Sequence, residues 1–240
     1  MTTDYRSKLY GSYVFGHQGV LPEERNQARM AADVLRHLPA RRDVRILDLG
    51  CGQGMLVRFL RANGYSQVTG IDVSADQIAL AHELGTDGVR EADLFETAEA
   101  EAGRWDVVVA LDVVEHFDRP DVQRLFSALA RLLRAGGTLV LRTPNGSSPY
   151  SGRYQFSDLT HGVIYTDRSL EQVAAATGFT DVAVFPVRPA GDGVRQRIRR
   201  ALWTVIEAMM ILPLVVETGQ LRGHVVTQNL VCRATREATP

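Results

Sequence analysis

Short apolar runs recur along most of this chain. The first covers residues 44–49, and comparable runs cover residues 68–72, 105–111 and 138–142. Runs of this length are typical of buried strands, and the segments between them have helical spacing. The pattern therefore predicts an α/β fold in which strands and helices alternate.

Helix signals occupy the segments between these strands. We predict helices over residues 55–62 and 75–84, a helix that ends over residues 129–137, and another over residues 167–177. Ser74 precedes the second of these helices and is a favourable N-cap residue.

Three further elements complete the outline. Residues 89–94 read as a third strand that ends in Asp-Leu, residues 224–234 as a final strand, and residues 22–38 as an early helix. The chain then divides into an N-terminal helical segment (1–43), an α/β core (44–188), and a C-terminal helix and strand that complete the same domain (189–240).

Three glycines at alternate positions follow the first strand, in the sequence VRILDLGCGQG. Glycine at Gly50, Gly52 and Gly54 lets the backbone turn sharply and approach a ligand closely. The dinucleotide fingerprint G-x-G-x-x-G is not matched, because Met55 stands where its third glycine would be. The carboxylate of Asp48 would repel a pyrophosphate, so the loop favours a cationic ligand such as a sulfonium or an ammonium.

A second acid ends the next strand. Asp72 follows Gly50 by 22 residues, close to the roughly 20-residue spacing of ribose-binding acids in nucleotide-binding folds. Its carboxylate can accept hydrogen bonds from both ribose hydroxyls. Ligands of open α/β sheets bind outside the carboxyl ends of the strands, so both acids are expected at one site.

The pattern D-x-G-x-G-x-G, from Asp48 to Gly54, resembles motif I of the class I S-adenosylmethionine (SAM) dependent methyltransferases. The D-x-x-E-H sequence at residues 112–116, after the fourth strand, is similar to that of ubiquinone-type and related small-molecule O-methyltransferases. The sequence LLRAGG before the fifth strand is also typical of that family. The resemblance is close over residues 44–144 and looser as far as Phe179.

This resemblance implies a Rossmann-like, mostly parallel sheet of seven strands in the order 3-2-1-4-5-7-6, with strand seven antiparallel and helices on both faces. It also implies SAM as the cofactor, with Asp93 bonding the adenine amine and Leu94 packing on the ring. The cofactor-binding residues predicted on this basis are Asp48, Gly50, Cys51, Gly52, Gly54, Asp72, Val73, Asp93, Leu94, Leu111 and Asp112.

Aromatic residues are dense near the N-terminus, where Tyr5, Tyr10, Tyr13, Phe15 and His17 fall within 13 residues. Such a segment could form a lid that excludes water from the bound cofactor, or it could pack on the sheet as an ordinary arm. We predict the lid, with Tyr13 as a substrate contact. Removal of the first 16 residues should then abolish turnover and leave a folded core.

A long polar segment, rich in Gly, Pro and Ser, follows the fifth strand at residues 144–165. Loops of this length in compact domains are usually functional. The string F-x-D-x-T-H within it resembles methyltransferases of sugar, polysaccharide and natural-product pathways. Candidate acceptor contacts are Tyr150, Arg153, Tyr154 and Asp158; a guanidinium among tyrosines suits an anionic acceptor, and the alternative is a solvated loop arginine.

Two histidines are candidates for a general base. Methyl transfer to an alcohol is helped by proton removal, and a histidine with a pKa of about 6.5 suits that task. We favour His161 in the long loop as the base, with His116 lining the acceptor pocket or sharing the role. Asp158 or Asp112 could orient the imidazole. A purely structural role for either histidine is the alternative, and an acceptor that is already ionised would need no base.

The C-terminal part contains a basic stretch followed by an apolar one, over residues 195–216. This order is typical of an interfacial helix. It could cap the acceptor pocket, form a dimer surface, or dock on a membrane that carries a lipid-linked acceptor. We favour a cap or a homodimer over peripheral membrane contact, and Glu207 and Pro213 argue against a membrane span.

Composition limits the partners. The net charge is −1, and no basic stripe with interleaved aromatic residues is present, so a nucleic-acid partner is not expected. Cys51 and Cys232 are far apart in sequence, which fits a reduced cytosol. The N-terminus lacks an apolar signal region. No C-x-x-C pair or histidine cluster occurs, and we expect no metal.

These observations predict a cytoplasmic SAM-dependent methyltransferase that acts on a small molecule. We expect transfer to an oxygen of a small molecule, a sugar, or a phospho or phosphono acceptor. N-methylation of an amino sugar or similar amine is the alternative within the family. A non-catalytic SAM-binding partner subunit and an NAD-dependent dehydrogenase are alternatives of other classes, and the dehydrogenase is disfavoured by the glycine spacing and by a single lysine, Lys8.

Overall fold

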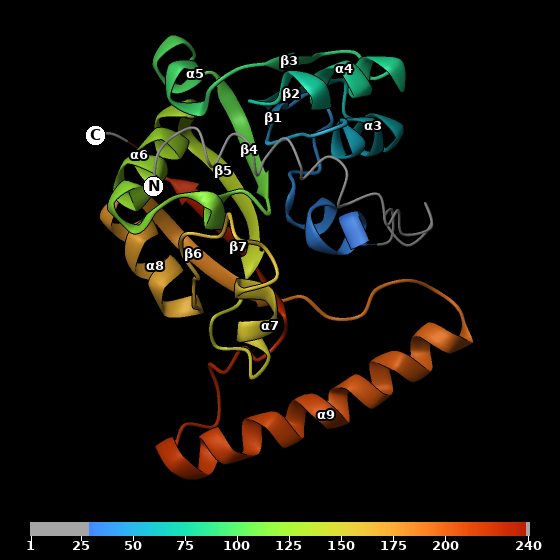
Figure 1. The fold of residues 1–240 in the computed structure, drawn as a ribbon, viewed down its shortest axis with the longest axis vertical. Helices are drawn as coiled ribbons and strands as arrows, with labels where there is room; N and C mark the ends of the chain where they lie inside the picture. The colour runs from blue at the N-terminus through green and yellow to red at the C-terminus, as the bar shows by residue number, and fades with distance from the viewer. Residues whose placement is uncertain (1–28, 239–240) are drawn as a thin grey trace.

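The computed structural model describes residues 29–238, and one mixed sheet runs through the main body (Figure 1). Its strands are β1 (Arg45–Leu49), β2 (Gln67–Asp72), β3 (Val89–Glu91), β4 (Trp105–Leu111), β5 (Leu133–Pro144), β6 (Phe179–Pro186) and β7 (Asn229–Arg236). Their order is β3-β2-β1-β4-β5-β7-β6. Strand β7 is antiparallel to both β5 and β6, and β1 to β5 are parallel. The predicted order and the antiparallel last strand are confirmed.

Helices cover both faces of this sheet (Figure 1). The α-helices are α3 (Met55–Ala62), α4 (Ala75–Glu83), α5 (Leu94–Ala100), α6 (Val122–Leu132), α7 (Ser151–Gln155), α8 (Asp167–Ala176) and α9 (Val194–Thr218). Short 3₁₀ helices are η1 (Leu35–His37), η2 (Val114–His116) and η3 (Arg119–Asp121).

Alternate residues of the central strands point into two different buried layers. In β4, Val108 and Ala110 belong to a cluster with α5, α6 and α8, whereas Val107 and Val109 belong to a cluster with α3 and α4. Burial on both faces explains why the central strands are unbroken apolar runs rather than alternating ones.

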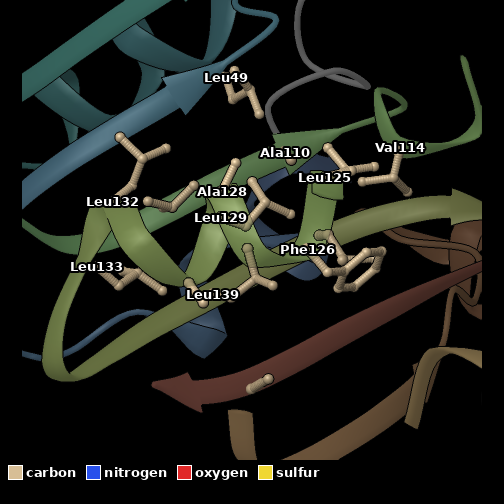
Figure 2. Close-up of a cluster of buried hydrophobic side chains, with 14 of the residues drawn as sticks. Leu49, Ala110, Val114, Leu125, Phe126, Ala128, Leu129, Leu132, Leu133 and Leu139 are labelled. Carbon is tan, nitrogen blue, oxygen red and sulfur yellow. The ribbon is translucent and has the colours of Figure 1, made fainter. Parts of the chain in front are cut away.

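Helix α6 supplies much of the first layer (Figure 2). Leu125, Leu129 and Leu132 recur at helical spacing and, like Phe126, are fully buried. They pack toward β4 and β5, where Leu139 lies in the same cluster. This apolar face holds the helix against the sheet and keeps the loop that follows β4 at the sheet edge.

The structure corrects the predicted boundary between α6 and β5. We expected the helix to run to Gly137 and the strand to begin at Thr138. Instead α6 ends at Leu132 and β5 begins at Leu133. The pairing of β5 with β4 jumps from Leu133 to Thr138, with an irregular register there. The C-cap residue Leu133 already has an extended backbone, with a φ of −77° and a ψ of 140°, which ends the helix before the two glycines.

The third strand is shorter than predicted. Strand β3 stops at Glu91, and Asp93 instead caps α5. Its Oδ1 accepts hydrogen bonds from the backbone N–H groups of Phe95 (2.7 Å) and Glu96 (3.1 Å). An aspartate that satisfies the first N–H groups of a helix favours a helix start over continued strand.

Other element boundaries also differ from the predicted ones. Strand β7 begins at Asn229 rather than at His224, and the predicted loop contains the short helix α7. The early helix predicted over residues 22–38 falls mostly outside the described residues, of which residues 29–33 are helical.

Helix α9 lies apart from the main body (Figure 1). Of its residues only Glu207 is buried. With a mean hydropathy of 1.6 in its most apolar window, it is long and apolar enough to cross a membrane by length and composition alone. Both of its ends lead back to neighbouring strands of the sheet, β6 and β7.

Candidate functional site

The glycine loop after β1 is shaped by close packing. Gly50 and Gly54 have φ angles of +67° and +74°, and Gly54 is the N-cap of α3. An added Cβ would lie 2.6 Å from the Val113 side chain at Gly50, and 2.5 Å from the Thr86 side chain at Gly54. Positive φ and these contacts together restrict both positions to glycine.

Gly52 differs from the other two glycines. Its φ is +49°, but the nearest atom to an added Cβ would be Gln77 Oε1 at 3.5 Å. Its backbone N–H donates to Asp72 Oδ2 at 2.9 Å. The protein therefore leaves open the side of the loop at Gly52, which fits a loop that a ligand approaches closely.

Asp72 joins the loop after β1 to the loop after β2. Its Oδ2 accepts the hydrogen bond from the Gly52 N–H, and its Oδ1 accepts a second one from the N–H of Ser74, at 2.9 Å. Val73, between them, is 62% exposed. Two backbone bonds fix the carboxylate, and each oxygen retains lone-pair capacity for a ligand hydroxyl, as the predicted ribose contact needs.

Asp48 is buried near the end of β1, and its Oδ2 has no hydrogen-bond partner among the described residues. Burial, with a smaller contribution from Asp72, raises the pKa of Asp48 to about 8. A buried carboxyl without a partner is costly in its ionised form. A cationic ligand group at the loop would stabilise that form, and the sulfonium and ammonium of SAM are such groups.

The remaining cofactor candidates are tied to the fold in different ways. Burial raises the pKa of the Cys51 thiol, which packs against Gly70 of β2. Leu94 is buried in the first hydrophobic layer, and Leu111 is half-buried at the end of β4. Asp93 caps α5 beside them. The backbone of these four residues lies along the carboxyl edge of the sheet, and the side chain of Leu94 packs into the hydrophobic layer.

Asp112 follows β4 in a left-handed conformation, with a φ of 56°. Both of its oxygens are engaged by Arg142 of β5: Nε lies 3.0 Å from Oδ1, and Nη2 donates to Oδ2. Arg142 also donates from Nη1 to Asp33 at 2.9 Å. Burial raises the pKa of Asp112, but Arg142 outweighs this and the net pKa is below the usual value.

Sequence reasoning missed Arg142 and Asp33. The available signal was an arginine inside an apolar strand, in LVLRTP, which in a buried strand requires an acidic partner. The partner from the N-terminal segment could not be identified without the fold, because Asp33 is 109 residues away.

His116 is held by a chain of hydrogen bonds that starts at Asp158. Asp158 Oδ1 accepts from the Thr160 hydroxyl at 2.6 Å, and Thr160 Oγ1 lies 2.7 Å from His116 Nδ1. The Thr160 hydroxyl has one proton, which it donates to Asp158, so His116 Nδ1 must donate to Thr160. This tautomer leaves the lone pair of the imidazole on Nε2.

His161 lies beside His116, with ring centroids 5.0 Å apart. Its Nδ1 is 3.1 Å from the backbone oxygen of Tyr154. A carbonyl only accepts, so this imidazole also keeps its lone pair on Nε2. Burial, and then the neighbouring His161, lowers the pKa of His116 below its usual value. His116 is therefore neutral at pH 7 and able to accept a proton.

Glu115 anchors the long loop beneath these histidines. Its backbone oxygen accepts from the N–H groups of Gly162 (2.8 Å) and Val163 (3.2 Å), and its side chain accepts from Thr143 (3.0 Å). Burial, and then Asp112, raises the pKa of Glu115 to about 8. The sequence places Glu115 within D-x-x-E-H, but the pattern alone does not predict this anchoring role.

Ligand atoms of Glu115, His116 and His161 all lie within 4.8 Å of one another. Two imidazoles and a carboxylate are a donor set that zinc or iron can use. The sequence predicts no metal, because it contains no C-x-x-C pair or histidine cluster, and His116 and His161 are 45 residues apart. The fold instead brings together three groups that could hold one.

The candidate acceptor contacts lie on or beside α7. Tyr150 is 58% exposed, and the Arg153 guanidinium carbon is 6.0 Å from the centre of the Tyr154 ring. No ion pair holds Arg153 among the described residues, so it can receive an anionic group. Tyr13 and the predicted lid lie outside the described residues and stay predictions.

A family model described as a methyltransferase domain matches residues 23–184 of this chain. The chain belongs to this methyltransferase family. The match spans the glycine loop and the two segments that carry His116 and His161, and it confirms the class I SAM-dependent assignment. The cofactor of this class is SAM, as predicted, and the dehydrogenase alternative is wrong.

Curated relatives match part of the chain. A ubiquinone biosynthesis O-methyltransferase of Alkalilimnicola ehrlichii is 38% identical over 106 residues, which are 42% of this chain and 42% of that protein. A malonyl-[acyl-carrier protein] O-methyltransferase of Enterobacter lignolyticus is 36% identical over 118 residues, 49% of this chain and 45% of that protein. The chain thus matches less than half the length of these relatives.

Solved structures share the fold. A SAM-dependent methyltransferase from Archaeoglobus fulgidus has a TM-score of 0.68 and 21% identity, and the match covers 93% of this chain and 99% of that one. A phosphoethanolamine N-methyltransferase 2 of Haemonchus contortus, in complex with S-adenosylhomocysteine and phosphomonomethylethanolamine, has a TM-score of 0.62 and 22% identity, covering 99% of this chain and 59% of that one. At these identities the likeness concerns the fold.

Proposed function

We propose that this chain transfers a methyl group from SAM to an oxygen of a small-molecule acceptor, with His116 as the general base. The observation that carries the proposal is the hydrogen-bonded chain from Asp158 through Thr160 to His116. It sets the tautomer that puts a proton-accepting Nε2 on a neutral imidazole. The names of the two curated relatives, both O-methyltransferases, support oxygen as the acceptor atom.

The residues that would hold SAM are those of the glycine loop with Asp48, Asp72 and Asp93. When bound, SAM supplies a methyl group already activated by its sulfonium. The chain then has to align an acceptor with that methyl group and exclude water. His116 Nε2 takes the proton that the acceptor hydroxyl loses, and the Thr160–Asp158 pair stabilises the imidazolium that forms.

We propose His116 rather than His161 as the general base. The sequence favoured His161 because it lies in the long loop, but its Nδ1 is held by a backbone carbonyl and no carboxylate supports it through that bond. Asp158 is the orienting acid rather than Asp112, since Arg142 engages both oxygens of Asp112. Arg153 and Tyr154 remain the proposed contacts for an anionic acceptor.

N-methylation of an amine is the second candidate. The structural likeness to a phosphoethanolamine N-methyltransferase keeps it open, and a phosphorylated amine would also suit Arg153. A neutral amine is a nucleophile before it loses a proton, so it depends less on a base. Loss of the base therefore separates the two candidates.

The test is an acceptor screen with SAM, using matched alcohols, phenols, carboxylates and amines, read by product mass. His116→Gln should lower kcat on an oxygen acceptor by about 10²–10⁴-fold and leave the Kd of SAM unchanged. His82→Gln, an exposed histidine on α4, is the matched control. Turnover of amines alone would replace O-transfer with N-transfer. SAM binding without any turnover would favour a partner subunit.

A further inference from the structure

Helix α9 carries an apolar stripe along its outer face. Six large hydrophobic side chains, each between 55% and 78% exposed, recur at intervals of four and three residues: Ile198, Leu202, Val205, Met209, Leu212 and Val216. This spacing places them on one side of the helix. Contiguous apolar surface of this kind on a protein marks a site of interaction.

The one acid in the middle of α9 faces the main body. Glu207 accepts hydrogen bonds from Arg188, at 2.8 Å from Nε and 3.0 Å from Nη2, and it is the buried residue of the helix. At 100° per residue, it lies on the side of the helix opposite the stripe. No charge therefore interrupts the stripe from Ile198 to Val216.

The first two turns of α9 are strongly basic. They contain Arg195, Arg197, Arg199 and Arg200, and no acid lies in the first turn. Arg195 and Arg197 flank the start of the stripe on its two sides, as their helical angles require. Arginines beside an apolar face complement an anionic lipid surface, where headgroups meet acyl chains.

Connectivity argues against a membrane span. The ends of α9 lead to Pro186 of β6 and Asn229 of β7, which lie at the same edge of one sheet, where Pro186 pairs with Leu230. A spanning helix would put these attachments on opposite sides of the bilayer.

A second copy of the chain is a poorer occupant of the stripe. Parallel pairing of two α9 helices would bring the arginines of both copies together. Antiparallel pairing would set four arginines against the far end of the partner helix, whose last two turns hold one acid, Glu217. Neither arrangement neutralises the basic turns, whereas anionic lipid does so.

We infer that α9 docks this protein on anionic membrane surfaces, lying in the plane of the interface with its apolar stripe in the acyl boundary. The carboxyl edge of the sheet is nearest to the docked helix, because β5 and β6 end and β7 begins there. Tyr150, Phe156 and Leu159 are exposed on the loop at that same edge. Docking needs no turnover, so it stands or falls separately from methyl transfer.

The test measures how the full chain, without SAM, partitions into two kinds of vesicle. One contains phosphatidylcholine alone, and the other contains about one third phosphatidylglycerol. Binding should require the anionic lipid and weaken at high salt. Leu202→Asp with Met209→Asp should reduce partition at least about tenfold, as should Arg195→Glu with Arg197→Glu. Sedimentation velocity without lipid gives the oligomeric state of each variant.

Matched controls carry the same changes elsewhere. Leu84→Asp alters an exposed leucine at the end of α4, and Arg41→Glu with Arg104→Glu reverses two charges at the opposite edge of the sheet. Both should partition like the unaltered chain. Absence of binding at low salt would overturn the inference. So would normal binding by the stripe variant, or a lipid-free dimer that the stripe substitutions dissociate.

Discussion

Two buried carboxyls give the site its pH dependence. Asp48 and Glu115 each have a pKa raised to about 8, chiefly by burial. Glu115 has a hydrogen-bond partner in Thr143, whereas Asp48 Oδ2 has none among the described residues. The two carboxyls at the sheet edge therefore differ: Asp48 lacks a partner that a cationic ligand group could supply, whereas the Glu115 carboxyl already accepts a hydrogen bond from Thr143.

SAM binding should be linked to ionisation of Asp48. Below about pH 8 the carboxyl is protonated in the free protein, and a cationic ligand favours the ionised form. The affinity for SAM should therefore rise with pH up to about 8 and then level off. Calorimetric titration in buffers of different ionisation enthalpy should show proton release at pH 7.

Asp48→Asn is the matching variant. The pKa of Asp48 is higher in the folded than in the unfolded protein, so the unfolded chain loses the proton at a lower pH. The ligand-free protein therefore loses stability progressively as the pH rises from about 4 to about 8. The asparagine variant should melt at a higher temperature than the parent at pH 7 and bind SAM more weakly without pH dependence. An unchanged pH profile would contradict the role of Asp48.

The activity should show an acid limb set by His116. Its pKa is lowered below the usual value, so the imidazole is lost as a base only when pH falls through that lower value. On an oxygen acceptor, kcat should be flat at neutral pH and fall only at a pH on the acid side of the usual histidine range. Asp158→Asn should lower kcat about tenfold or more, with KM for SAM little changed.

The pH profile of kcat recorded with a chelator distinguishes His116 as a general base from His116 as a metal ligand. A general base needs no metal, so kcat should survive chelation. Loss of activity with EDTA and recovery with a divalent cation would show instead that Glu115, His116 and His161 act as a metal site, as their spacing within 4.8 Å permits.

At the scale of elements, the glycine loop combines two functions. Gly50 and Gly54 permit close packing of β1 and α3 on their neighbours, whereas a Cβ at Gly52 would meet only Gln77 Oε1, at an ordinary contact distance of 3.5 Å. Identical residues two positions apart thus serve stability in one case and ligand approach in the other. The sequence pattern alone does not distinguish them.

Alanine substitutions should separate these functions. Gly50→Ala should lower the free energy of unfolding by about 1–3 kcal/mol, because its Cβ would meet Val113 in a left-handed conformation. Gly52→Ala should cost only about 1 kcal/mol and weaken SAM binding about tenfold. Urea denaturation and calorimetry measure the two effects. Equal stability losses with equal binding would refute the distinction.

Helix α6 offers a second test at this scale. Leu129 is fully buried between the helix and the sheet, so Leu129→Ala should lower the free energy of unfolding by about 2–5 kcal/mol. The exposed Leu84 at the end of α4, replaced by alanine, should change it by less than about 0.5 kcal/mol. Comparable losses would mean that α6 does not anchor the sheet.

At the scale of the whole molecule, α9 is attached to the folded body along one side only. Glu207, paired with Arg188, is its one buried residue, and Trp203, Met210, Ile211, Leu214 and Val215 are half-buried on the same side. The strands on either side of it, β6 and β7, are antiparallel neighbours that a short turn could join. The sheet therefore does not need α9 to form.

Replacement of residues 190–223 by a short Gly-Ser turn should leave a folded protein. Residues 225 and 227 stay, since their backbone oxygens bind Asn145. The free energy of unfolding should change by less than about 2 kcal/mol, and the Kd of SAM should be unchanged. Thermal unfolding and calorimetry provide the measurements; an unfolded product would show that α9 supports the sheet.

Local pattern was sufficient for the sheet and the cofactor loop. Buried strands, a Gly50–Gly54 turn and acids at strand ends are all encoded within a few residues, so the sequence could reveal them. The strand order followed from the family that these residues resemble. The boundaries at Leu133 and Asp93 were predicted wrongly, because an extended backbone at Leu133 and the helix cap formed by the Asp93 side chain overrode the apolar pattern.

The sequence by itself determined the fold class, the family and the identity of the acids beside the glycine loop. Only tertiary structure decided which distant groups meet: Arg142 with Asp33, and His116 with Thr160 and Asp158. The physical reason is that hydrogen bonds and burial act through space, whereas the apolar pattern reports only the local chain. The exposure of α9 was likewise decided only by the tertiary structure, because its residues alone do not show which side packs on the body.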